Sequence, residues 1–180
     1  SVSGQKDLKD AKGIDVKYNA NQDTIWLDGI DQAYTVDTDK QLKGVEDFSI
    51  SLGVETTATN IDLIRLGNDV SVSIDENGYV VFKVKDLTVN SKEIVTTVVE
   101  KAHGTFGTAE YVPTSTNSKV VGNVNDGNPH SIDLVREANG MLKVYVDGKL
   151  SNSTYDENHI NEAIKGGAIV VCDSKFTGKL

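Results

Sequence analysis

The sequence predicts an all-β domain, folded as a two-sheet antiparallel sandwich of the jelly-roll type. Short apolar and β-branched runs recur along the 180 residues, and turn signals separate them about every eight to twelve residues. Several runs alternate apolar and polar residues, which is the pattern of a half-buried strand. The sequences Asp75-Glu76-Asn77-Gly78 and Ala138-Asn139-Gly140 predict tight hairpin turns between such runs.

Each predicted strand rests on alternation, on β-branched content or on flanking turn residues. The clearest are FSISLGV at residues 48–54 and the two runs beside Asn139-Gly140. In chain order, strands are predicted at residues 14–18, 24–27, 33–36, 48–54, 61–66, 70–74, 79–84, 94–99, 120–124, 132–136, 141–146, from 149 onward, and 167–172. One helix is predicted at residues 157–165, since Asp156 can cap its start and Gly166 can end it. Residues 101–119 are predicted to be a long irregular loop, a kind of segment that is often functional.

Composition and charge exclude some functions. The formal net charge is −9, and the sequence has no basic stripe of the kind that nucleic-acid binding requires. No apolar run approaches the roughly 20 residues that a membrane helix needs, so membrane insertion is not expected. Cys172 is the single cysteine, so no internal disulfide can form, and its apolar neighbours predict a buried, inert thiol.

The order of several motifs resembles that of concanavalin A-like (laminin-G-like) domains. The stretches that carry the resemblance are LDGIDQAYTVDTDKQLKGVEDFSISLGV, the hairpin at residues 75–84, GNPHSIDLVREANGMLKVYVDGKL and GAIVVCDSKFTGKL. Together they cover roughly residues 24–180. One departure is Pro129, where members of this family usually have Trp before the His. The resemblance implies a concanavalin A-like jelly roll and a lectin-like accessory domain of a bacterial surface protein.

The expected organisation is an N-terminal arm or linker at residues 1–13 and one sandwich domain at residues 14–180. The family usually continues beyond Gly-Lys-Leu with one more strand, whereas this sequence stops at Leu180. We expect that strand to be missing, or to be supplied by residues 14–18 or by another chain. A sheet edge left open in this way would be a site of self-association.

Catalysis is not expected. Concanavalin A-like glycanases carry paired acids on one strand, which flank the scissile bond as nucleophile and acid/base, and the sequence contains no such run. The adjacent acids Glu46-Asp47 and Asp75-Glu76 fall at strand ends or turns, where solvated loop acids are common. His103, His130 and His159 lack the spacing of a zinc site.

A structural calcium ion is one hypothesis, because calcium takes carboxylate and backbone carbonyl oxygens. Related domains often hold calcium near an Asp-Gly turn and the last segment, so the resemblance implies Asp28, Gly29, Asp31 and Asp173 as ligands. The simpler alternative is that Asp28-Gly29 is only a turn.

Carbohydrate binding is the favoured function for this fold. Sugar sites combine an aromatic platform with polar groups that bind hydroxyls, and the irregular segment supplies His103, Phe106, Glu110 and Tyr111. Trp26 and Tyr34 are further aromatics, although alternation places Trp26 in the core. The two arginines, Arg65 and Arg136, each follow an apolar residue by two positions, so each is expected on the face of its apolar neighbours. Because a buried charge is costly, each is either half of an ion pair or a clamp for an anionic ligand.

These observations predict a non-catalytic carbohydrate-binding or adhesion module of a secreted or cell-surface protein, whose partner is a glycan or a surface protein. The first alternative is a structural or assembly domain that makes protein–protein contacts. The second is an accessory domain of a larger surface protease or glycosidase.

Overall fold

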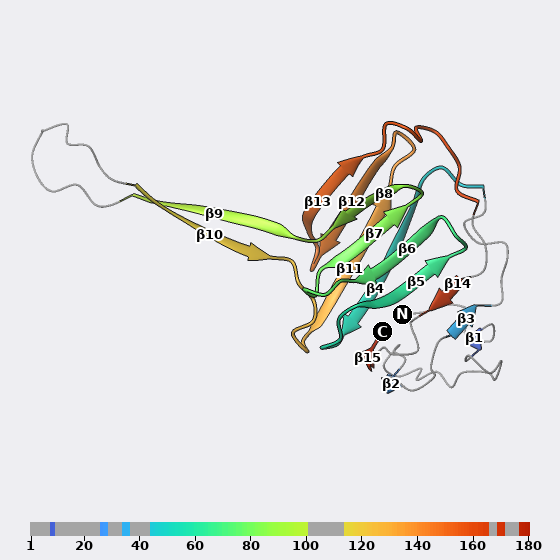
Figure 1. Ribbon diagram of the computed structural model, residues 1–180, viewed down its shortest axis with the longest axis horizontal. Helices are drawn as coiled ribbons and strands as arrows, with labels where there is room; N and C mark the ends of the chain where they lie inside the picture. Colours follow the sequence, from blue (N-terminus) through green and yellow to red (C-terminus); the bar gives the residue numbers. More distant parts are fainter. Residues whose placement is uncertain are drawn as a thin grey trace, which may run out of the picture.

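Two antiparallel sheets face each other in a β-sandwich, and a two-stranded ribbon extends from it (Figure 1). The computed structural model describes residues 8–9, 26–28, 34–36, 44–100, 114–165, 169–171 and 177–180. All pairings between its strands are antiparallel. No helix occurs within the described residues, so the all-β prediction is confirmed for them.

The larger sheet has seven strands in the order β1-β3-β14-β5-β6-β7-β8. Their bounds are β1 (Leu8–Lys9), β3 (Tyr34–Val36), β14 (Ile169–Val171), β5 (Ile61–Leu66), β6 (Val70–Ile74), β7 (Val80–Val84) and β8 (Leu87–Asn90). The first of these strands belongs to the segment that the sequence predicts to be an arm, and it pairs with β3. The predicted domain boundary after residue 13 stays a prediction.

The smaller sheet has six strands in the order β13-β12-β11-β4-β15-β2. Their bounds are β13 (Lys149–Tyr155), β12 (Met141–Val146), β11 (Pro129–Arg136), β4 (Phe48–Glu55), β15 (Thr177–Lys179) and β2 (Trp26–Asp28). The last strand of the chain, β15, lies between β4 and β2, and the side chain of Leu180 is buried.

The core lies between the two sheets because each sheet buries alternate residues of its strands. Val80, Phe82 and Val84 of β7 are fully enclosed, as are Ile132 and Leu134 of β11. A direct aromatic contact joins the sheets: the rings of Phe48 in β4 and Phe82 in β7 meet edge to face, with centroids 6.3 Å apart. Burial of these apolar faces is the main stabilising contribution to such a sandwich.

The predicted hairpin turns are confirmed. Gly78 and Gly140 have φ angles of +83° and +97°, which residues with a side chain seldom adopt. Added β-carbons would lie 2.0 Å from the Asn125 side chain and 2.5 Å from the backbone oxygen of Asp156, respectively. The sequence reasoning missed β8, because Lys85 turns the chain with a φ of +54° where no glycine marks the turn.

Two secondary-structure predictions were wrong in the described residues. The predicted helix at 157–165 is an irregular segment, since Asn161 has a φ of +56° and Arg136 occupies the carbonyls of His159 and Glu162. The predicted loop at 101–119 is a strand from residue 114 onward, where β10 (Thr114–Val121) pairs with β9 (Glu93–Glu100).

The root of the β9–β10 ribbon is held by a buried serine. The hydroxyl of Ser91 donates to the carbonyl of Gly122 at 2.6 Å and accepts from the N–H of Val80 at 2.9 Å. Its backbone N–H also donates to the carbonyl of Val80. The Ser91 side chain is fully buried, so it satisfies backbone groups that water does not reach.

Replacing this hydroxyl should destabilise the fold. We expect Ser91→Ala to lower the free energy of unfolding by about 1–3 kcal/mol, because a buried N–H and a buried carbonyl each lose a partner. Urea denaturation measures the change. Ser49→Ala, at an exposed position of β4, is the matched control, and equal stability of the two variants would contradict this role.

Candidate functional site

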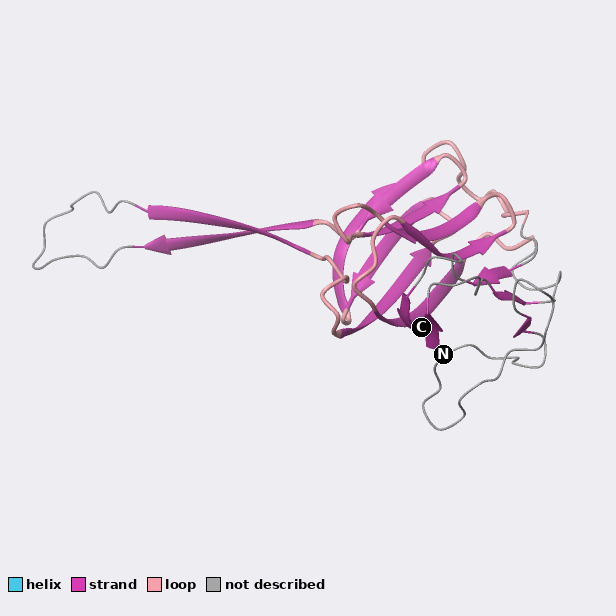
Figure 2. Ribbon diagram, turned by 60° about the horizontal axis from the view of Figure 1, so that its bottom comes forward, coloured by secondary structure: helices cyan, strands magenta, loops and turns pink. Residues whose placement is uncertain are grey.

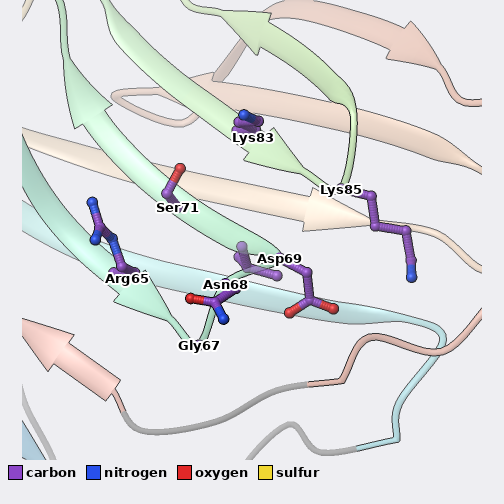
Figure 3. Close-up of a pocket in the computed structure, with 8 residues that line it drawn as sticks. Arg65, Gly67, Asn68, Asp69, Ser71, Lys83 and Lys85 are labelled. Atoms are coloured by element: carbon purple, nitrogen blue, oxygen red, sulfur yellow. The ribbon is translucent and has the colours of Figure 1, made fainter.

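A row of polar side chains crosses the outer face of the seven-stranded sheet. The strand registers place Arg65 of β5 opposite Ser71 of β6, and Ser71 opposite Lys83 of β7. Directly opposed residues share one face of a sheet, so the three side chains point the same way (Figure 3). Neighbouring strands lie about 4.8 Å apart, which separates the backbones of Arg65 and Lys83 by roughly 10 Å.

A β-bulge explains why Arg65 faces outward. The register of β5 against β6 shifts between Asp62 and Ile64, so Leu63 is an extra residue in the strand. Leu63 and Leu66 are both buried, and Arg65 is exposed. The expectation that Arg65 shares the apolar face of Leu63 was therefore wrong, because strict alternation does not continue through a bulge.

The row borders a shallow hollow of about 180 Å³. The tight turn at Gly67, which joins β5 to β6, forms one end, and β7 forms the opposite side (Figure 3). The lining residues are predominantly polar or charged: Arg65, Gly67, Asn68, Asp69, Val70, Ser71, Lys83 and Lys85. Three cationic side chains thus lie around one depression of a protein whose net charge is −9.

The acids beside the hollow leave Arg65 accessible, whereas the side chain of Lys85 is only 15% exposed. Arg65 pairs with Asp62 at 3.0 Å, and the two side chains are 57% and 45% exposed. An ion pair this exposed contributes only about 0–1 kcal/mol, so a ligand anion can compete for the guanidinium. Lys85 reaches Glu162 at 3.7 Å. Asp69 accepts from the backbone N–H of Lys165 through one carboxylate oxygen, and its buried Oδ1 has no hydrogen-bond partner.

Arg136 occupies a different environment from Arg65. Its side chain is 1% exposed, and its guanidinium donates to three backbone carbonyls. Nη1 binds the oxygens of Glu46 and Glu162 at 2.6 Å each, and Nη2 binds that of His159 at 3.1 Å. The sequence reasoning proposed an acid of a neighbouring strand or a ligand as its partner, and the observed partners are backbone carbonyls. Arg136 is a structural residue that ties β11 to two loops.

Loss of the buried guanidinium should unfold the protein more easily. Arg136→Met leaves three carbonyls without their donor, so we expect the free energy of unfolding to fall by about 3 kcal/mol or more. Arg65→Met, at an exposed position, should change it by less than about 0.5 kcal/mol. Chemical denaturation of both variants tests this, and a small effect of Arg136→Met would refute the structural role.

His130 is held between two aspartates at one end of β11. Its Nδ1 lies 2.8 Å from Asp147 and its Nε2 lies 2.7 Å from Asp126. Burial lowers the pKa of His130, but the hydrogen bonds to Asp147 and Asp126 outweigh it and leave the pKa above 6.5. For Asp147, burial raises the pKa, but the hydrogen bonds from His130 and the Ser131 N–H outweigh it and leave the pKa below 3.8. The His130 hydrogen bond is the main cause of the lowered pKa of Asp126.

These shifts predict how stability depends on pH. The raised pKa of His130 contributes stability below pH 6.5 that is lost as the pH rises through the folded-state value. The lowered pKa values of the aspartates contribute stability above pH 3.8 that is lost as the pH falls through their folded-state values. The stabilisation by this triad should therefore be largest between these limits. Melting curves of the wild type and His130→Gln should differ more at pH 5.5 than at pH 8.5, and a pH-independent difference would contradict the assignment.

Several residues singled out from the sequence lie outside the described residues. They are His103, Phe106, Glu110, Tyr111, Gly29, Asp31, Cys172 and Asp173. For Asp28 the structure describes the backbone alone, which pairs with Thr177 of β15. In the described ranges, no group of three His, Cys, Asp or Glu side chains could hold a metal ion. Both ligand roles of these residues, in sugar and in calcium binding, stay predictions.

Asp75 has a local role in its hairpin. Its carboxylate accepts from the backbone N–H groups of Asn77 and Tyr79 at 2.9 and 3.0 Å. This is the turn function that the sequence predicts for an acid at such a position.

Lys83 and Lys85 were missed as candidates by the sequence reasoning. A signal was present: aligning the predicted hairpin at 70–84 about its turn places Lys83 opposite Ser71. The sequence did not show that β5 pairs with this hairpin and contains a bulge, which turns Arg65 toward the outer face.

Comparison with solved structures shows the fold. The binding domain of Paraclostridial Mosquitocidal Protein 1 matches with a TM-score of 0.60 and 15% identity, over 98% of this chain and 42% of that one. The botulinum neurotoxin serotype D ligand-binding domain, in complex with N-acetylneuraminic acid, has a TM-score of 0.57 and 14% identity, over 95% and 39%. The botulinum neurotoxin DC binding domain, in complex with rat synaptotagmin II, has a TM-score of 0.55 and 13% identity, over 96% and 39%.

The chain spans about two fifths of the length of these structures. No protein-family model and no curated protein sequence matches it. In the part of the chain that the structure describes, no helix is long and apolar enough to cross a membrane. At 13–15% identity, the likeness establishes a β-sandwich of the kind found in these toxin binding domains.

Proposed function

We propose that this protein is a non-catalytic binding module for an anionic glycan, and that the hollow beside Arg65, Ser71 and Lys83 is its binding site. The observation that carries this proposal is the gathering of three cationic side chains around one polar depression in a protein of net charge −9. Like charges held around one hollow repel one another, and a ligand anion would relieve that repulsion.

The geometry suits a sugar that carries a carboxylate or sulfate. Arg65 offers a planar guanidinium that binds such groups through two parallel hydrogen bonds. Lys83, about 10 Å away across Ser71, adds a second charge. Between them, Ser71 and Asn68 can bind ring hydroxyls. Because the described lining contains no aromatic ring, recognition here depends on charge and hydrogen bonds rather than on stacking.

The similar structures support a binding role. They are binding domains by name, one solved with N-acetylneuraminic acid and another with synaptotagmin II. By analogy, the partner of this protein is a glycan or a surface protein, and the place of action is extracellular or at a cell surface. We also infer that the sandwich is of the concanavalin A-like type. A structural calcium ion near Asp28 remains part of the proposal.

A second candidate function is assembly through protein–protein contacts. The observation that favours it is the β9–β10 ribbon, which extends from the sandwich (Figure 2). Large apolar side chains of this ribbon are exposed. An accessory role beside a separate catalytic domain is compatible with either function.

Binding to a glycan array, with calcium and again with chelator, tests the proposal. We expect hits among sialylated, uronic-acid or sulfated glycans, with affinity that falls as salt rises. Arg65→Ala and Lys83→Ala should each weaken binding about tenfold or more, because each removes a charged hydrogen-bond donor. Binding that occurs with calcium and is lost with chelator would support the hypothesis of a structural calcium ion.

Two control variants sharpen the test. Asp62→Asn removes the acid that competes for Arg65, so it should strengthen binding. Lys92→Ala removes an exposed lysine outside the hollow and should have little effect. Binding of neutral glycans alone, or equal losses in Lys92→Ala and Lys83→Ala, would place the site elsewhere.

A further inference from the structure

The β9–β10 ribbon leaves the sandwich in a direction that its root fixes (Figures 1 and 2). At the root, a β-carbon on Gly122 would lie 1.8 Å from the backbone oxygen of Ser91, so the two strands approach each other closely there. The Ser91 hydroxyl joins the ribbon to β7. Each strand has eight residues, which gives a length of about 26 Å.

One face of the ribbon is apolar and open to solvent. Ile94, Val98 and Val120 are 65%, 60% and 47% exposed. The register pairs Ile94 with Val120 and Val98 with Thr116, so the three apolar side chains lie on the same face. A two-stranded ribbon in water is only marginally stable, whereas further strands and a covered face stabilise it.

The outer edge of β9 is unprotected. Among the described strands β9 pairs with β10 alone, so alternate residues direct their backbone N–H and C=O groups to the open edge. Natural proteins protect such edges with charges, prolines or bulges. Residues 94–99, Ile-Val-Thr-Thr-Val-Val, contain no charge, proline or glycine.

We propose that two copies of this protein associate by pairing their β9 edges antiparallel, with Thr96 of each copy facing Thr96 of the other at a two-fold axis. The result is a four-stranded sheet in the order β10-β9-β9-β10. This interface involves none of the residues of the glycan hollow. A test that contradicts the dimer would therefore not contradict the proposed glycan binding, and the reverse also holds.

The symmetry of the pair limits the register. In an antiparallel ladder, opposed residues both direct their backbone groups toward each other or both away. When the two strands are identical, the two residues of each opposed pair therefore both have even numbers or both have odd numbers. One residue of each copy then lies on the two-fold axis, opposite its own counterpart. The three central choices are Val95, Thr96 and Thr97.

Side-chain matching selects Thr96. With Thr96 on the axis, Ile94 faces Val98 of the second copy, so apolar meets apolar on the exposed face of the ribbon. With Thr97 on the axis, Val98 would face Thr96 instead. With Val95 on the axis, Ile94 would face Thr96. Only the first register pairs the exposed apolar side chains of Ile94 and Val98 with each other.

The charge distribution favours contact through the ribbon. From residue 92 to 100 and from 114 to 121, two lysines balance two glutamates, whereas the whole chain has a charge of −9. Two copies of a protein with this net negative charge repel each other at short range. The overlap of the ribbons holds the sandwiches about 26 Å apart, well beyond the roughly 8 Å screening length at physiological salt.

Sedimentation velocity over a concentration series tests the pairing. We expect a monomer–dimer equilibrium in the wild type. Thr96→Lys brings two lysines together at the axis and should raise the dimer dissociation constant about tenfold or more. Ser118→Lys is the matched control: Ser118 faces Thr96 across the ribbon, but it lies one strand away from the new interface, so its effect should be small.

The register is tested by paired charges and by cross-linking. Ile94→Lys and Val98→Glu should each weaken the dimer, because each sets a charge opposite an apolar side chain, and the double variant, which sets the two opposite charges against each other, should restore it. With Cys172 replaced by serine, Thr96→Cys should form a disulfide-linked dimer under mild oxidation, because opposed strand positions lie within disulfide range. Ser118→Cys should not.

Three outcomes would overturn the proposal. They are a monomer at every concentration, a dimer that Thr96→Lys and Ser118→Lys affect equally, and a dimer that Ser118→Cys links as readily as Thr96→Cys. Circular dichroism of each variant confirms that the ribbon and the sandwich remain folded.

Discussion

The structure depends on one constraint: each of the two sheets must turn one face toward the other and bury it. Along a strand the side chains alternate, so this requirement decides which residues become core and which become surface. Phe48 and Phe82 meet across the interface because both fall on inward positions of their strands. The outward positions between the core residues of β5, β6 and β7 then form a surface that is available for binding.

The second requirement is that buried polar groups form hydrogen bonds. Two side chains supply such bonds where loops would otherwise leave backbone groups unpaired. Arg136 donates to carbonyls of two separate loops, and Ser91 joins β7 to the root of the ribbon. Both residues are polar, and both act through backbone atoms rather than through other side chains. They hold irregular segments against a sandwich whose strands are otherwise stabilised by their own ladders.

The outward face and the ribbon offer two surfaces of opposite character. The hollow is polar and carries three cations, which suits a small charged ligand. The ribbon is nearly neutral, apolar on one face and open along one edge, which suits another strand. Because the two surfaces share no residue, the proposed glycan binding through the sandwich and the proposed association through the ribbon are compatible with each other. Association would then place two glycan sites in one particle and raise the avidity of binding to a surface.

The sequence by itself determined the fold class and the interior strands. Strands β5, β6 and β12 have the predicted bounds, and the turns at Gly78 and Gly140 lie where predicted, because alternation and glycine are local signals. The tertiary structure decided the environments of the two arginines. A bulge at Leu63 turned Arg65 outward, and three carbonyls from distant loops enclosed Arg136. It also decided that residues 157–165 are not helical, since Arg136 binds their carbonyls, and that residues 114–119 are a strand, since β9 pairs with them. Contacts between separate segments leave no periodic trace in the sequence, and neither does a bulge such as the one at Leu63.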